Sequence, residues 1–292
     1  MTSHFLTRAL TLGLFALSTL LVSCGSSTIY DPFRPTRVIV FGDSFSFIST
    51  TVAYTVNDSS TNNWASQIAA HYQVTNIVNR TAANALVAAV QTQVNTFGAN
   101  YQAGDLVVVS AGYRDIINDA VGSTNNAAAN GTAYANLIRS MVTNGAKHIA
   151  VTNVYDLSKT PSAGIQTNLA TLTGSRGALI AAFNDALKSN LGSATLTNVG
   201  EYVRLLDLEA YFNTVRASPT IYSFVDTTTV ACNSVGATVG IGAGQIDSSG
   251  CGTGTLAQAS YNSYVFADAV YPTPAFHRAW GNNAYAQLIA RW

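Results

Sequence analysis

The sequence has little charge, few cysteines and no excess of basic residues. Only 10% of its 292 residues are charged, whereas ordinary soluble domains have roughly 25%. Lys+Arg and Asp+Glu both number 14, so nothing in the composition favours contact with a phosphate backbone, and we exclude a nucleic-acid partner. Hydrophobic residues make up 48% of the chain, which excludes an intrinsically disordered protein and is enough for one large core.

The N-terminus carries the one apolar run that suits a targeting signal. Arg8 precedes a mostly apolar, uncharged run over residues 9–22. This run is shorter than the about 20 apolar residues of a membrane span and has the proportions of a signal-peptide core. The residues LVSC at positions 21–24 resemble a bacterial lipobox, in which the cysteine is acylated. The alternative is an ordinary secretory signal that happens to end in cysteine.

These features predict three segments. Residues 1–23 are a lipoprotein signal peptide, residues 24–36 a tether lipidated on Cys24, and residues 37–292 one folded domain. We expect export to the bacterial cell envelope, with the outer membrane favoured. The lipid on Cys24 would then attach the protein to the membrane.

The two remaining cysteines form an even pair. Cys232 and Cys251 bracket a Gly/Ser-rich stretch over residues 234–250, and in an oxidising compartment this pattern predicts a disulfide. In the chain-entropy model such a disulfide contributes about 3 kcal/mol. A metal site is the weaker interpretation, because two cysteines without a nearby histidine are an incomplete ligand set. No motif implies a metal or an organic cofactor.

Apolar runs alternate with helical patterns along the domain. We expect strands over residues 37–41, 75–78, 106–110, 148–153 and 203–207, and helices over residues 64–71, 83–97, 134–142, 178–191 and 274–291, with a polar loop over residues 118–130. Repeated strand–helix units with buried strands predict a parallel sheet covered on both faces.

Three motifs follow strands in a fixed order. FGDS at residues 41–44 comes directly after the first strand, and its Gly, Asp and Ser are also ordinary turn residues. SAGYRDI at residues 110–116 and YVFADAVYPT at residues 264–273 follow later in the chain. Together they resemble the first, third and last sequence blocks of the SGNH (GDSL) hydrolases. Residues 224–232 also look like a cysteine-bearing insertion of bacterial members related to autotransporter esterases.

The resemblance implies both a fold and a chemistry. The family has a three-layer α/β/α sandwich with a parallel, flavodoxin-like sheet, and its members hydrolyse esters with a Ser nucleophile, a His base and an Asp that orients the His. By this resemblance Ser44 would be the nucleophile, Asp268 the orienting acid and Gly112 part of the oxyanion pocket.

The sequence departs from the family at positions that carry the chemistry. Tyr271 stands where the base His is expected, and a phenol with a pKa near 10 is a poor general base at neutral pH. Arg114 stands where the oxyanion Asn is expected, and the second block, matched to residues 76–82, lacks both of its glycines. His277 is a doubtful substitute base, because capping or packing explains it more simply.

Two functions therefore stay open. One is an envelope lipoprotein that hydrolyses acyl or acetyl esters, with attenuated activity. The alternative is a catalytically silent binding or scaffolding lipoprotein. For Arg114 we expect either an ion pair with Asp43, Asp115 or Asp268, or contact with an anionic small-molecule ligand.

Overall fold

The computed structural model describes residues 32–49, 52–60, 63–162, 173–192 and 199–292. Residues 34–292 form one compact unit. The predicted signal peptide over residues 1–23 and the predicted lipidation site at Cys24 lie outside the described residues. Within the described ranges, no helix combines the length and the apolarity that crossing a membrane requires.

Five parallel strands form the central sheet. They are β1 (Arg37–Gly42), β2 (Ile77–Asn79), β3 (Asp105–Ser110), β4 (Ile149–Thr152) and β5 (Val203–Leu206), in the order β2-β1-β3-β4-β5. Burial explains the apolar runs, because β3 and β4 are buried along their whole length. All five strands lie within two or three residues of the ranges expected from the sequence.

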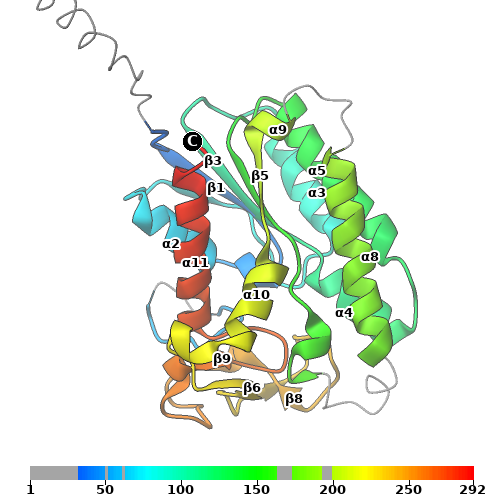
Figure 1. Cartoon of the computed structure of the whole chain (residues 1–292), viewed down its shortest axis with the longest axis vertical. Coiled ribbons are helices and arrows are strands. Elements are labelled where there is room, and N and C mark those ends of the chain that lie inside the picture. The colour runs from blue at the N-terminus through cyan, green and yellow to red at the C-terminus, as the bar shows by residue number, and fades with distance from the viewer. Residues whose placement is uncertain (1–31, 50–51, 61–62, 163–172, 193–198) are drawn as a thin grey trace, which may run out of the picture. The chain divides into compact units, whose positions relative to one another are not determined.

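Helices cover both faces of the sheet. Figure 1 shows α2 (Trp64–His71) and α11 (Pro274–Ile289) on one side, and α3 (Val87–Phe97), α4 (Tyr113–Gly122), α5 (Ala127–Thr143) and α8 (Thr173–Gly192) on the other. The short α9 (Val199–Tyr202) precedes β5 and α10 (Leu208–Ala217) follows it. The three-layer α/β/α sandwich with a parallel sheet is therefore confirmed.

The polar loop expected over residues 118–130 is wrong. Helix α4 extends to Gly122 and α5 begins at Ala127, so only a short turn remains between them. The buried face of α4 carries Tyr113, Ile116 and Ala120, three or four residues apart. This apolar stripe starts before the polar stretch and was hidden in the sequence by the Asn and Asp residues on the opposite face.

A small β-rich insertion separates α10 from α11. It contains β6 (Asp226–Val230), β7 (Val235–Gly236), β8 (Gln245–Ile246) and β9 (Tyr264–Phe266), with β6 paired to β9 in parallel and β7 to β8 antiparallel. A disulfide joins Cys232 to Cys251, as the sequence predicts. In Figure 1 the insertion lies at the lower end of the molecule, beyond the carboxyl ends of the sheet strands.

Candidate active site

The strand order places a crevice between β1 and β3. The chain turns from β1 to β2 on one side and passes from β3 to β4 on the other, so the connections diverge at this point. In open parallel sheets ligands bind at such a switch point, outside the carboxyl ends of the strands. Gly42 is in register with Ser110, so the turns that follow β1 and β3 lie side by side.

Ser44 occupies the turn after β1. It is the first residue of the short 3-10 helix η1 (Ser44–Ser46), and only 3% of its surface is exposed. Its Oγ accepts a hydrogen bond from the backbone N–H of Asn84 at 2.8 Å. Asn84 has a φ of 57°, in the left-handed region that asparagine tolerates better than most residues. The structure thus gives Ser44 one backbone donor.

Asn84 is a site residue that the sequence analysis missed. We had matched the family's second block to residues 76–82, but β2 occupies Ile77–Asn79, and the donor to Ser44 comes later in the chain. Shifted by three residues, NRTAANA at residues 79–85 follows the expected Asn-x-Ala-x-Gly-Gly-Ala order, with Asn84 on the second Gly. The spacing of Asn79 and Ala85 was the signal that would have found it.

Asp43 fastens the two turns together. Its carboxylate accepts hydrogen bonds from Phe45 N (3.1 Å), Ser110 Oγ (3.1 Å) and Tyr113 N (3.3 Å). Burial raises the pKa of this carboxyl from 3.8 to about 7, and these donors offset only part of the rise. Asp43 is therefore a structural acid beneath the site.

Gly112 begins α4 at the end of the turn after β3. Its φ of 115° lies in the region that favours glycine, and an added Cβ would overlap the ring of Phe183. Glycine at this position thus lets the chain turn from β3 into α4 and lets α8 pack closely beside it.

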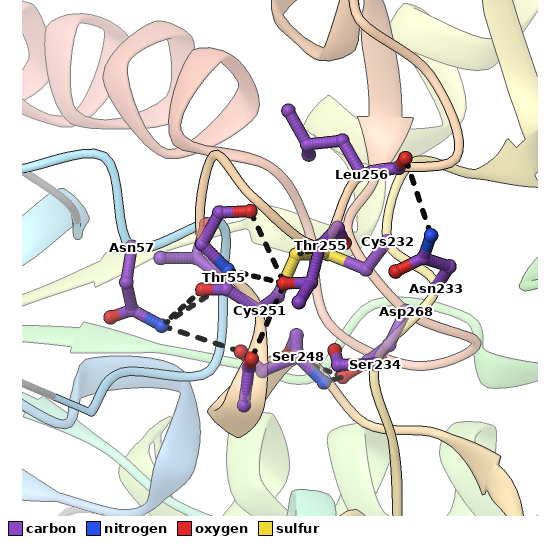
Figure 2. The surroundings of a disulfide bond; sticks show 12 residues. Thr55, Asn57, Cys232, Asn233, Ser234, Ser248, Cys251, Thr255, Leu256 and Asp268 are labelled. Carbon is purple, nitrogen blue, oxygen red and sulfur yellow. Dashed lines mark hydrogen bonds between the residues drawn. A yellow bond between two sulfur atoms is a disulfide. The ribbon is translucent and has the colours of Figure 1, made fainter.

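Asp268 lies in the turn that follows β9 and is fully buried. One carboxylate oxygen accepts from Val270 N (2.7 Å) and Tyr271 N (2.6 Å), and the other accepts from Ser248 N (3.0 Å) and from the Ser248 hydroxyl. Figure 2 shows Ser248 reaching Asp268 from the insertion. Burial raises the pKa of the carboxyl to about 6. Both oxygens are occupied by structural donors.

Tyr271 places a phenol where a base would be needed. Its side chain is fully buried against Tyr54, with 5.0 Å between the ring centroids, and its hydroxyl has no hydrogen-bond partner among the described residues. Burial and the nearby Asp43 raise its pKa well above 10, and the neighbouring Ser44 hydroxyl opposes this rise only in part. The phenol stays protonated at neutral pH, so it can donate a hydrogen bond but cannot accept the Ser44 proton.

His277 belongs to the packed core. Its ring lies 5.0 Å from the ring of Phe45, and the side chain is 1% exposed. Burial lowers its pKa to about 3. No hydrogen bond to Ser44 or Asp268 joins it to the site in the part of the chain that the structure describes, which agrees with a packing role.

Arg114 carries a positive charge into the site without an acidic partner. Its Nη1 lies 3.4 Å from Asn84 Oδ1 and 3.5 Å from the Thr238 carbonyl oxygen. Among the described residues, no carboxylate oxygen comes within 4.0 Å of it. The expected ion pair with Asp43, Asp115 or Asp268 is therefore wrong. Asp115 instead accepts from Val87 N at 2.9 Å, at the start of α3.

The disulfide-bearing insertion covers the site. Asn57 Nδ2, on the loop after η1, donates to the carbonyl oxygens of Cys251 (2.9 Å) and Ser248 (3.4 Å), as Figure 2 shows. On the other side the Arg114 guanidinium packs directly over Gly240. The cover is thus joined to the sheet at Asn57, Asp268 and Arg114. No three His, Cys, Asp or Glu side chains gather as metal ligands in the described ranges.

Comparisons with known proteins agree with this arrangement. The sequence matches the family model of GDSL-like lipases/acylhydrolases over residues 38–284. The fold is similar to that of a member of the lipolytic G-D-S-L family from Veillonella parvula, at 11% identity and a TM-score of 0.52, covering 88% of this chain and 99% of that one. A putative GDSL-like lipase from Parabacteroides merdae gives 10% identity and a TM-score of 0.51, with 89% and 98% covered. The acetyl xylan esterase AlAXEase gives 9% identity and a TM-score of 0.50, with 86% and 98% covered. A search of curated sequences found no match.

Proposed function

Because this chain belongs to the GDSL-like lipase/acylhydrolase family, we propose that it is an ester hydrolase of attenuated activity that acts on acyl or acetyl esters through Ser44. The observation that carries the proposal is the contact between Ser44 Oγ and the Asn84 N–H at the switch point of the sheet. The attenuation rests on Tyr271, which occupies the place of a base but keeps its own proton.

The chemistry requires a proton acceptor for Ser44. Attack of Oγ on the ester carbonyl forms a C–O bond and an oxyanion, which the Asn84 N–H and the Arg114 guanidinium are placed to stabilise. With no basic side chain beside Ser44, water must take the hydroxyl proton, the alcohol leaves, and a second water hydrolyses the acyl-enzyme. Loss of the base in a hydrolase of similar logic lowers kcat about 10⁶-fold, so only slow turnover is expected.

The location is part of the same proposal. The sequence LVSC at residues 21–24 supports lipidation on Cys24, and hence attachment to a membrane of the bacterial cell envelope. The lipid would hold the domain close to esters of the envelope.

Hydrolysis of p-nitrophenyl acetate and butyrate by the purified chain, beside Ser44→Ala, tests the proposal. We expect slow turnover above the buffer rate that is lost in Ser44→Ala while the melting temperature changes little. A control variant, Ser223→Ala, lies outside the site and should keep the wild-type rate, because Ser223 follows α10 on another part of the molecule.

A catalytically silent binding or scaffolding protein is the second candidate. The fully protonated phenol of Tyr271 and the four structural hydrogen bonds on Asp268 favour it. Equal rates for the wild type and Ser44→Ala at all substrate concentrations would rule out the hydrolase in favour of this candidate.

A further inference from the structure

Hydrogen-bond donors gather around Asn84. Its backbone N–H points at Ser44 Oγ, and its Nδ2 donates to the Tyr54 hydroxyl at 2.8 Å. The ring of Tyr54 in turn packs on Tyr271, whose buried hydroxyl has no partner among the described residues. Arg114 completes the group from the other side, with Nη1 3.4 Å from Asn84 Oδ1.

Acceptors and negative charge are short in the same place. A guanidinium presents five donors and is always charged, yet the recorded contacts of Arg114 are two long ones to neutral oxygens. The nearby acids do not supply the missing charge. Asp43 is engaged by three donors and Asp268 by four, and neither forms an ion pair with Arg114.

We propose that the space between Ser44, Asn84, Arg114 and Tyr271 binds a small carboxylate. The Arg114 guanidinium would take the carboxylate through its planar fork, and the Tyr271 hydroxyl would donate to the same anion. Binding of this kind needs no base and no turnover, so it does not depend on the proposed hydrolysis.

A carboxylate fits this space better than a phosphate. Arg114 is the only cation in contact with Asn84 among the described residues, and two buried carboxyls, Asp43 and Asp268, lie close to Tyr271. One positive charge suits a monoanion, whereas a phosphate dianion would face two neighbouring acids without a second cation. An acid is also one product of ester hydrolysis, so the anion would compete with an ester for Ser44.

Binding is tested by titrating acetate and butyrate into the purified full chain, at constant ionic strength and without ester. Isothermal calorimetry and the melting temperature report saturable binding to the folded state. We expect Arg114→Gln to weaken binding roughly tenfold or more, because a charge-assisted pair is lost. Arg114→Lys should fall between, since it keeps the charge but not the fork. Tyr271→Phe should weaken binding less than Arg114→Gln does.

The matched control is Arg34→Gln, which removes the same charge from an exposed position before β1. This variant and Ser44→Ala should bind like the wild type. Equal affinity in Arg114→Gln and the wild type, absence of saturable binding, or tighter binding of inorganic phosphate would each overturn the proposal. Failure of the hydrolysis assay would not, because no ester is present.

Discussion

Tyr271 keeps the backbone role of its position while changing its chemistry. Its N–H donates to Asp268 at 2.6 Å and its hydroxyl lies next to Ser44, so the segment has the geometry of a serine hydrolase site. What is missing is one acceptor of a proton. At the residue scale the state of the site depends on this side chain and on what surrounds Asp268.

Restoring a histidine should not restore activity. In Tyr271→His the imidazole would need Asp268 to orient it, but both carboxylate oxygens are already occupied, two of the hydrogen bonds coming from Ser248. We expect kcat/KM on p-nitrophenyl acetate to rise less than about tenfold, far below the roughly 10⁶-fold effect of a working base.

Removal of the Ser248 hydroxyl should help the new histidine. The double variant Tyr271→His with Ser248→Ala frees one lone pair of Asp268, and we expect it to be several-fold faster than Tyr271→His alone. Ser248→Ala by itself serves as the control and should not gain activity. A large gain in Tyr271→His alone would show that Asp268 is less committed than its hydrogen bonds indicate.

Buried acids should make the fold less stable at alkaline pH. The pKa of Asp43 is raised from 3.8 to about 7 by burial, so between these values the folded state holds a proton that the unfolded chain releases. Stability is then highest below about pH 4 for this group and falls as the pH rises through about 7. Asp115 and Asp268, whose pKa values burial raises to about 6, act in the same direction.

Urea unfolding at about pH 5 and about pH 8 measures this dependence. Asp43→Asn should lower stability at both values but reduce the difference between them, because the titrating group is gone. Asp226→Asn is the control, since hydrogen bonds from Thr228 and Thr229 hold the pKa of Asp226 below the tested window despite some burial. A wild-type difference that is unchanged in Asp43→Asn would contradict the assignment.

Sequence reasoning found those site residues that stand at fixed distances from strands. Ser44 and Gly112 follow β1 and β3 directly, and the apolar runs locate both strands. It missed Asn84 because that residue lies in an irregular segment after β2, where no periodic pattern fixes the alignment. The partners of Arg114 were also out of reach, because Thr238 is 124 residues away in the chain.

At the scale of elements, the insertion depends on its disulfide. The bond closes the Cys232–Cys251 segment, and the buried cluster around it includes Val56 from the loop after η1 and Ala267 from the turn after β9. Replacing both cysteines by serine should cost about 3 kcal/mol of unfolding free energy. Urea denaturation measures the loss, and the reduced wild type should show the same value; equal stability of oxidised and reduced wild type would contradict it.

Gly240 should be intolerant of a side chain. Its φ of 90° favours glycine, and an added Cβ would overlap the Arg114 guanidinium. We expect Gly240→Ala to cost roughly 1–2 kcal/mol from backbone strain and displacement of Arg114.

Two controls separate these causes by urea denaturation. Gly254→Ala, where an added Cβ meets nothing within 4 Å, should be close to neutral. In an Arg114→Ala background Gly240→Ala should cost less, because only the backbone strain remains. Equal costs in both backgrounds would show that the two residues are not coupled.

The sheet could be predicted more fully than the helices. Buried parallel strands read as continuous apolar runs, as in RVIVFG and DLVVVS. Helix α4 was missed because its exposed face is rich in Asn and Asp, which are typical of loops as well. The pairing of β6 with β9 joins segments that are separated by Gly/Ser-rich chain, and no local pattern announces it.

For the whole molecule, the direction of β1 decides where an anchor would sit. The chain enters the sheet at Arg37 and reaches Ser44 at the other end of the strand, roughly 20 Å away for six residues. If Cys24 is lipidated as proposed, the anchored segment joins the domain at the end opposite to Ser44. Esters would then reach the site from the side of the domain that faces away from the tether.

Cell fractionation tests the anchor. In a bacterium that processes lipoproteins, we expect the wild-type chain in the membrane fraction and Cys24→Ala in the soluble fraction, with equal melting temperatures for the purified domain. A wild-type chain that is released without detergent would contradict lipidation and favour an ordinary secretory signal.

The contact between Asn57 and the insertion also sets an order of events during synthesis. Asn57 and Cys251 are 194 residues apart in the chain, so at about 5–20 residues per second the second partner emerges roughly 10 to 40 s after the first. For that interval Val56, later fully buried against the disulfide, has nothing to pack on. Ser44 is therefore the part of the sheet that closes last, and a ribosome stalled before residue 251 would carry a folded sheet with an open site.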